Sequence, residues 1–198
     1  GIRLAQRLYD TARADGCQFF LDASAYSVSE GAEGWQVLAD SGRTTRCLCA
    51  GAVLLALGAS ENALAFPGWT KPGVITAGAA QTMVNLERVR VGSRVLMVGA
   101  GNVGLIVSYQ LLQAGIDVAA VIEAAPRVGG YAVHANKLRR AGVPIYTSHT
   151  ILEARGEPAV RQAVIARVDG SFQPIPGTEE TLDVDTVCLA VGLSPLIK

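Results

Sequence analysis

The chain of 198 residues is 50% hydrophobic and 17% charged, which predicts a globular protein with one sizeable core or two modest ones. Its 17 lysines and arginines balance its 17 aspartates and glutamates, and no long run of like charges occurs. We therefore expect neither a nucleic-acid partner nor a membrane partner.

The first quarter of the chain predicts a helix followed by an antiparallel sheet. Residues 3–14 carry apolar side chains at helical spacing, and Asp15-Gly16 ends that helix. Short strands separated by turns follow at residues 26–29, 35–39 and 44–48. Residues 52–57 are wholly apolar, so we expect a buried strand there.

The start of the chain bears on its origin and compartment. Gly1 stands where a complete chain has Met, and the first residues form no apolar signal-peptide region. We interpret the chain as a piece excised from a longer, cytoplasmic protein.

The centre of the chain predicts a strand, a turn, a helix and a second strand. Residues 65–73 are rich in proline and glycine and are expected to form a linker, followed by a short helix at residues 82–89. Residues 95–116 lack charge and have the length of a membrane span. Glycines and amide side chains interrupt this stretch, however, and favour a strand at 94–98, a helix at 102–114 and a strand at 117–122.

The last third of the chain completes the predicted fold. A helix at residues 133–141 leads to a third parallel strand at 145–148, and further strands are expected at 151–154, 163–168 and 186–191. The predicted class is α/β, a Rossmann-like parallel βαβαβ sheet that carries a three-stranded β-meander. The N-terminal part is a smaller mixed segment.

The turn after the first central strand has the pattern G-x-G-x-x-G, in the residues Gly99, Ala100, Gly101, Asn102, Val103 and Gly104. Gly99 permits a tight turn, Gly101 lets a pyrophosphate approach the backbone, and Gly104 allows close packing of helix on strand. The pattern alone also fits an ordinary tight turn. Its position between a strand and a helix favours a dinucleotide site.

Glu123 ends the second central strand, where a carboxylate can accept hydrogen bonds from an adenosine ribose. Its negative charge would repel a 2′-phosphate, and Ala124 next to it offers no side-chain donor, so NAD is expected as the cofactor. Arg127 follows closely and could pair with a 2′-phosphate, which keeps NADP open. A solvated acid at the end of a strand is the alternative interpretation of Glu123.

Other chemistry finds little support. No cluster of residues has metal-ligand spacing, and no side chain is expected to be catalytic. The chain contains no C-x-x-C, so disulfide reduction is not expected. Cys17 and Cys188 lie in apolar runs, where buried thiols are common.

Taken together, these segments resemble the two-dinucleotide-domain flavoproteins of the pyridine nucleotide-disulfide oxidoreductase superfamily. Residues 53–59 are similar to the strand that returns to the FAD domain, residues 66–68 to the crossover, and residues 184–195 to the strand that closes the NAD domain. Residues 76–81 and 127–131 most resemble large subunits of heteromeric sarcosine, opine or amine oxidoreductases.

The resemblance implies that residues 1–74 are part of an FAD domain and that residues 75–198 form an NAD(P)-binding domain. It also implies that Gly192 lies near the nicotinamide. A second G-x-G-x-x-G, which would hold the FAD pyrophosphate, is missing from this sequence. We therefore expect a fragment of an FAD-dependent NAD(P)H oxidoreductase that is inactive without further FAD-binding segments.

Two other functions stay open. The domain could have a non-catalytic role in nucleotide binding or assembly within a heteromeric amine or opine oxidase, beside a partner subunit. An S-adenosylmethionine methyltransferase also uses a glycine turn and an acid after the second strand. In the expected parent enzyme, a small-molecule substrate reacts at the flavin.

Overall fold

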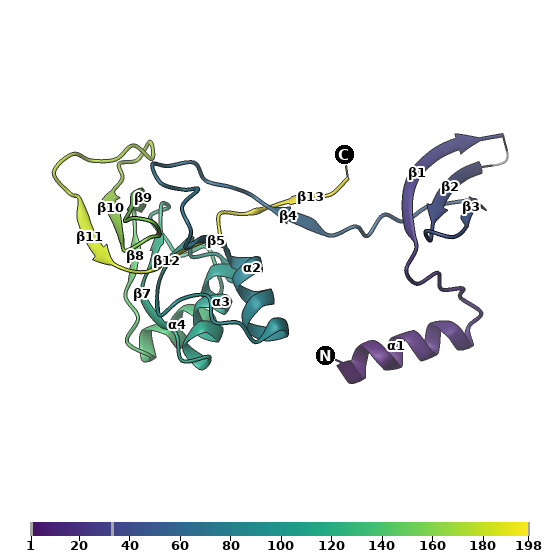
Figure 1. The fold of residues 1–198 in the computed structure, drawn as a ribbon, viewed down its shortest axis with the longest axis horizontal. Coiled ribbons are helices and arrows are strands. Elements are labelled where there is room, and N and C mark those ends of the chain that lie inside the picture. The colour runs from purple at the N-terminus through teal and green to yellow at the C-terminus, as the bar shows by residue number, and fades with distance from the viewer. Residues whose placement is uncertain (1, 33, 198) are drawn as a thin grey trace. The chain divides into compact units, whose positions relative to one another are not determined.

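The computed structural model describes residues 2–32 and 34–197 and divides the chain into two compact units, residues 1–56 and 57–198 (Figure 1). Residues 1, 33 and 198, which fall within the predicted domains, lie outside the described residues. Residues 57–74 belong to the second unit. The assignment of residues 1–74 to an FAD domain and of 75–198 to an NAD(P) domain stays a prediction.

The first unit contains helix α1 (Ile2–Ala14) and an antiparallel sheet. Its strands are β1 (Ser24–Gly31), β2 (Gly34–Asp40) and β3 (Thr45–Ala50), in the order β1-β2-β3. The predicted helix and the three predicted strands are confirmed.

The predicted buried strand at residues 52–57 is wrong. These residues form no strand, and the side chain of Leu54 is 92% exposed. A wholly apolar strand is stable between sheet neighbours that cover both its faces. Among the described residues no strand pairs with this segment, so its apolar side chains face solvent.

The second unit is built on a five-stranded sheet in which all neighbours are parallel, in the order β5-β12-β6-β7-β8. Leu96 and Met97 of the central strand are completely buried because both faces of the sheet are covered. The strands are β5 (Val74–Thr76), β6 (Arg94–Val98), β7 (Asp117–Glu123), β8 (Ile145–Thr147) and β12 (Thr186–Leu189).

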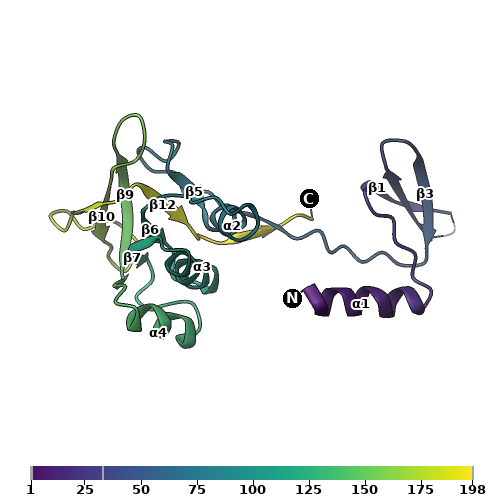
Figure 2. The same cartoon turned by 60° about the horizontal axis from the view of Figure 1, so that its bottom comes forward.

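Helices cover one face of this sheet and a β-meander covers the other (Figure 2). Successive side chains of β6 alternate between the two layers. Met97 packs in one core with Leu105 and Leu111 of α3, whereas Leu96 packs in the other with Ile165 of the meander. The helices are α2 (Ala77–Thr82), α3 (Asn102–Gln113) and α4 (Ala132–Arg140). No described helix is both long enough and apolar enough to cross a lipid bilayer.

The helix predicted at residues 82–89 is only partly confirmed. The α-helix ends at Thr82 and continues as a single π-helical segment, Met83–Glu87. Arg88 then adopts a left-handed conformation, with φ of +59°, and ends the segment.

The meander consists of β9 (His149–Arg155), β10 (Gln162–Arg167) and β11 (Glu180–Asp183), in the order β11-β10-β9. The predicted meander of three strands is confirmed, but no strand was predicted at β11, because β11 is short and largely exposed at the edge of its sheet. The segment predicted at residues 186–191 instead forms β12, which lies between β5 and β6. All four residues of β12 are buried, as expected for a central parallel strand.

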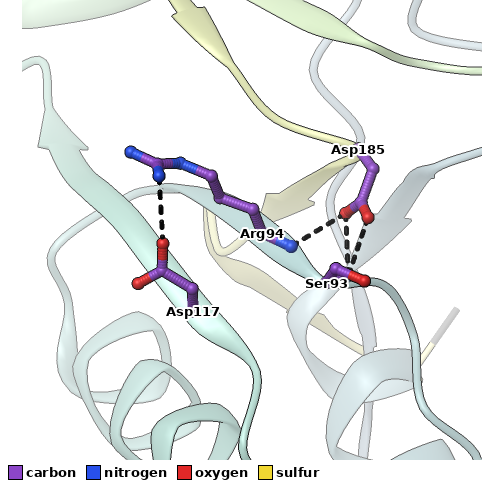
Figure 3. Close-up of polar contacts among 4 residues, drawn as sticks. All are labelled: Ser93, Arg94, Asp117 and Asp185. Carbon is purple, nitrogen blue, oxygen red and sulfur yellow. Dashed lines mark hydrogen bonds and ion pairs between the residues drawn. The ribbon is translucent and has the colours of Figure 1, made fainter.

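Asp185 holds β12 against β6 at the amino ends of these strands (Figure 3). Its carboxylate accepts hydrogen bonds from the backbone amides of Ser93, at 2.8 and 3.0 Å, and of Arg94, at 3.0 Å. Burial alone would raise the pKa of Asp185, but these hydrogen bonds and one from the Thr186 hydroxyl outweigh it and lower the pKa. The contact fixes the register of the two strands whose opposite ends form the candidate site.

Candidate functional site

The turn between β6 and α3 needs glycine at two positions. Gly99 has φ of +107°, and a Cβ there would strike the carbonyl oxygen of Ala190. A Cβ on Gly104 would strike the carbonyl oxygen of Gly99. Gly101 differs, because its φ of −72° suits any residue and a Cβ built on it meets nothing within 4 Å. The space in front of Gly101 is therefore open.

Helix α3 points its amino end into this open space. Gly101 is the N-cap residue, and no described side chain caps the helix. The amides of Asn102, Val103 and Gly104 have no acceptor within an α-helix that begins here. Together with the positive end of the helix dipole, they provide the setting in which proteins bind phosphate groups.

A cleft of about 160 Å³ lies at the carboxyl ends of β6 and β12. The strand order reverses between β6 and β12. From β6 the chain continues to β7 and β8 on one side, whereas β12 and β5 lie on the other side. Ligands of open α/β sheets bind at such a switch point. The lining residues are Glu61, Gly101, Asn102, Val103, Ala190, Gly192 and Leu193. The structure thus brings Gly192 together with the glycine turn.

Glu123 lies at the end of β7 and contacts the glycine turn directly. Its Oε2 accepts a hydrogen bond from the Ala100 amide at 2.8 Å, and its Oε1 accepts one from the Ala125 amide at 3.0 Å. A carboxylate has about four lone-pair positions, so acceptor capacity remains on the half-buried side chain. Ala124 is also half-buried beside it.

Arg127 does not join this group. Its side chain is exposed, and it forms no ion pair or side-chain hydrogen bond with any described residue. It is also absent from the residues that line the cleft.

The loop at residues 129–131 touches the glycine turn, a contact that sequence reasoning missed. The Gly130 amide donates to the Ala100 carbonyl at 2.9 Å, and the Tyr131 amide donates to Asn102 Oδ1 at 2.8 Å. A Cβ on Gly130 would lie 2.9 Å from the Asn102 nitrogen. The glycine pair at 129–130 was the available signal. The loop borders the open space at Gly101 without filling it.

Glu61 was also missed, although it lines the cleft. It belongs to β4 (Ala59–Glu61), which pairs antiparallel with β13 (Leu193–Pro195) and places Glu61 opposite Leu193. Its Oε1 accepts a hydrogen bond from the Gly78 amide at 2.6 Å. No local pattern in the sequence marks this residue, because its position depends on pairing with a strand about 130 residues away.

The cysteines offer no redox pair in the described structure, where all four are free. Burial raises the pKa of the Cys188 thiol to about 12, and the charge of Glu61 adds to the increase. Cys17 is exposed, contrary to the expectation of a buried thiol, because residues 17–20 form an irregular segment outside any core. Among the described residues no group of His, Cys, Asp or Glu could hold a metal ion.

Residues 6–198 match the family model described as pyridine nucleotide-disulphide oxidoreductase. The chain belongs to this family. The predicted family resemblance is therefore confirmed, and with it the assignment to a family of oxidoreductases.

Curated relatives include components of several multi-subunit enzymes. The chain is 28% identical over 194 residues to hydrogen cyanide synthase subunit HcnB of Pseudomonas protegens, covering 88% of this chain and 41% of that protein. It is 29% identical over 157 residues to the alpha subunit of sarcosine oxidase from Rhizobium meliloti, covering 76% and 14%. The chain thus spans about two fifths, or less, of the length of these relatives.

Solved structures of the family share the fold. Thioredoxin reductase of T. acidophilum superposes with a TM-score of 0.74 at 18% identity, over 98% of this chain and 60% of that chain. An FAD-dependent pyridine nucleotide-disulphide oxidoreductase from Desulfovibrio vulgaris gives 0.60 at 24% identity, over 88% and 44%. The predicted Rossmann-like α/β class is confirmed.

Proposed function

We propose that residues 75–198 bind a nicotinamide dinucleotide and, within a longer flavoprotein, hold it for hydride transfer to or from FAD. The observation that carries the proposal is the open space at Gly101, which faces the amino end of α3 at the switch point of the sheet. A pyrophosphate fits this setting, because backbone amides and the helix dipole both favour its charge. The hydride chemistry belongs to the two cofactors, and the chain supplies binding and orientation.

The proposed site uses Gly99, Ala100, Gly101, Asn102, Val103 and Gly104 for the pyrophosphate, chiefly through the backbone. Glu123 accepts hydrogen bonds from the adenosine ribose, beside Ala124, and repels a 2′-phosphate, so that NAD is preferred. Arg127 is exposed and without a partner among the described residues, so it can turn toward a 2′-phosphate, and NADP is the second candidate cofactor.

Residues 1–74 contribute, in this proposal, an incomplete part of an FAD domain. The apolar run at residues 52–57 supports it, because side chains as exposed as those of Leu54 (92%) and Leu57 (56%) are normally covered. The chain by itself should retain little FAD. The absorbance spectrum of the purified chain in the region of the flavin bands measures how much FAD it retains. One bound flavin per chain would contradict this expectation.

Titration calorimetry of the chain with NADH, NADPH and S-adenosylmethionine tests the nucleotide site, and binding of NADH is the expected result. A Gly101→Ser variant should weaken NADH binding by roughly tenfold or more, because the new side chain fills the open space and caps the same amides. Serine is a preferred N-cap, so the fold should keep or gain stability. Gly170→Ser is the matched control, since a Cβ there also meets nothing within 4 Å. Absence of heat with either nicotinamide cofactor would reject the proposal, and binding of S-adenosylmethionine alone would favour a methyltransferase.

A non-catalytic role is the second candidate, because relatives from sarcosine oxidase and opine oxidase are named as subunits of larger enzymes. In that case the nucleotide serves assembly beside a partner subunit, which oxidises the small-molecule substrate. Stopped-flow mixing of the complete flavoprotein with NADH separates the two functions. Rapid bleaching of the flavin supports hydride transfer, and an unchanged flavin spectrum supports the assembly role.

A further inference from the structure

Glu61 is the one ionisable side chain among the described residues that line the switch-point cleft. The other lining residues are glycines, an asparagine and small or apolar side chains. A single carboxylate in such a cleft has little competition from neighbouring charges, so its effect on a bound ligand is large.

The carboxylate of Glu61 is held from two directions. The pairing of β4 with β13 places Glu61 opposite Leu193, and the Asn62 amide donates to the Gly192 carbonyl at 3.0 Å. The Gly78 amide donates to Oε1 at 2.6 Å, whereas a Cβ on Gly78 would lie 2.7 Å from Oε2. The absence of a side chain at Gly78 therefore makes room for the carboxylate. One oxygen is engaged, and the other keeps its acceptor capacity.

The proposed function fixes which half of the dinucleotide approaches Glu61. Glu123, on the β7 side of the switch point, takes the adenosine ribose. A dinucleotide laid across a switch point then extends its other half to the opposite side, where β12 ends. Gly192, Leu193 and Glu61 lie on that side. The carboxylate of Glu61 therefore faces the nicotinamide half.

We infer that Glu61 is a positioning residue for the nicotinamide riboside, and that its charge makes the site prefer the oxidised nucleotide. The inference rests on the proposed nucleotide site. The carboxamide of the nicotinamide and the ribose hydroxyls can donate hydrogen bonds, and a carboxylate can accept them. The oxidised ring carries a positive charge and the reduced ring none, so a fixed carboxylate stabilises NAD⁺ more than NADH. Bound NADH is then a stronger reductant than free NADH.

The charge of Glu61 also acts on strand β12. It contributes, after burial, to the raised pKa of the Cys188 thiol in β12. Cys188 lies two residues before Ala190, which lines the cleft. The field of this carboxylate thus reaches the strand on which the nicotinamide half would rest.

Calorimetric titration of the chain with NAD⁺, NADH and ADP-ribose tests the inference. The Glu61→Gln variant keeps a carbonyl oxygen for the Gly78 amide and removes the charge. We expect its preference for NAD⁺ over NADH to fall by roughly three- to tenfold, because only the oxidised ring carries a charge. ADP-ribose keeps the pyrophosphate and the second ribose but lacks the ring, so its affinity measures what the variant changes apart from the ring charge. Glu180→Gln, which removes an equal charge from the exposed strand β11, is the control. It should change neither the preference for NAD⁺ over NADH nor the affinity for ADP-ribose.

A second variant moves the carboxylate without changing its charge. Gly78→Ala places a methyl group against Oε2, and the flexible end of Glu61 must shift. Alanine favours helix α2, so folding should be preserved. We expect the same loss of NAD⁺ preference, smaller in size.

The outcomes separate this inference from the proposed function. If the unmodified chain binds ADP-ribose and both nucleotides while Glu61→Gln leaves the NAD⁺ to NADH ratio unchanged, the inference is wrong and the proposed function stands. If the unmodified chain binds none of the three, both are rejected.

Discussion

The carboxylate of Glu123 and the amide of Ala100 are joined by a hydrogen bond of 2.8 Å between the end of β7 and the glycine turn. The same carboxylate accepts a second bond from the Ala125 amide. These contacts hold the acid in place before any ligand arrives. A side chain ordered in advance loses little conformational freedom on binding, which favours affinity.

Replacing Glu123 by alanine should weaken NADH binding by about 1–3 kcal/mol, the usual cost of leaving buried hydrogen-bonding groups unpaired. The gap between NADH and NADPH should narrow, because the charge that repels a 2′-phosphate is gone. Calorimetric titration with both nucleotides measures the two effects.

Glu123→Gln is the control for the structural part of that loss. Its amide oxygen can still accept the bond from Ala100, so stability should fall less than in Glu123→Ala. If Glu123→Ala bound NADH and NADPH with unchanged affinity, Glu123 would not be part of the nucleotide site.

The strand, turn and helix around the glycine motif were predictable because their information is local. The apolar run of β6, the glycines at 99, 101 and 104, and the segment of α3 follow one another directly in the sequence. The requirement for glycine at 99 comes from the chain's own φ of +107° and from the nearby Ala190 carbonyl. The unusual φ is indicated by the glycine motif itself, whereas the contact with Ala190 can be known only from the folded structure.

The failures depend on contacts between distant segments. Residues 52–57 have the composition of a central strand, yet a strand also needs neighbours, which composition does not supply. Glu61 enters the cleft only because β4 pairs with β13, and Gly130 reaches the glycine turn only through the loop after β7. Neither relation leaves a periodic pattern in the sequence.

Asp185→Asn should destabilise the chain by about 1–2 kcal/mol, because it weakens charge-assisted hydrogen bonds to the amides of Ser93 and Arg94 (Figure 3). Urea unfolding measures this loss. The exposed ion pair between Arg94 and Asp117, at 3.3 Å, is the contrast, and Asp117→Asn should cost between zero and about 1 kcal/mol. Equal losses in the two variants would contradict the special role of Asp185.

The contribution of Asp185 should also depend on pH. Its folded-state pKa lies below the ordinary value of 3.8, so the folded state stabilises the ionised form. That stabilisation is complete above pH 3.8 and disappears as the pH falls through the lower folded-state pKa. The difference in unfolding free energy between the unmodified chain and Asp185→Asn should therefore be constant near neutrality and shrink only below that pH. A difference that shrinks between pH 7 and 5 would assign the effect to another group.

Cys188 should resist alkylation in the folded chain. Its thiol is fully buried, and its pKa of about 12 leaves almost no thiolate at pH 8. Cys17, Cys47 and Cys49 are exposed and should react with iodoacetamide, as mass spectrometry of peptides can show. All four should react in urea, which controls for reagent access. Labelling of Cys188 at the rate of Cys47 in the folded chain would contradict the structure.

Gly99→Ala should destabilise the chain without acting on the ligand space directly. At φ of +107° an alanine is strained, at a typical cost of about 1–3 kcal/mol, and its Cβ would also strike the Ala190 carbonyl. Urea unfolding should show a lower midpoint with an unchanged slope. Gly101→Ser, two residues away and at an ordinary φ of −72°, should leave that midpoint equal or higher while NADH binding falls. If both variants lowered stability equally, Gly101 would be a structural glycine like Gly99, and the open space in front of it would lose its significance as a phosphate site.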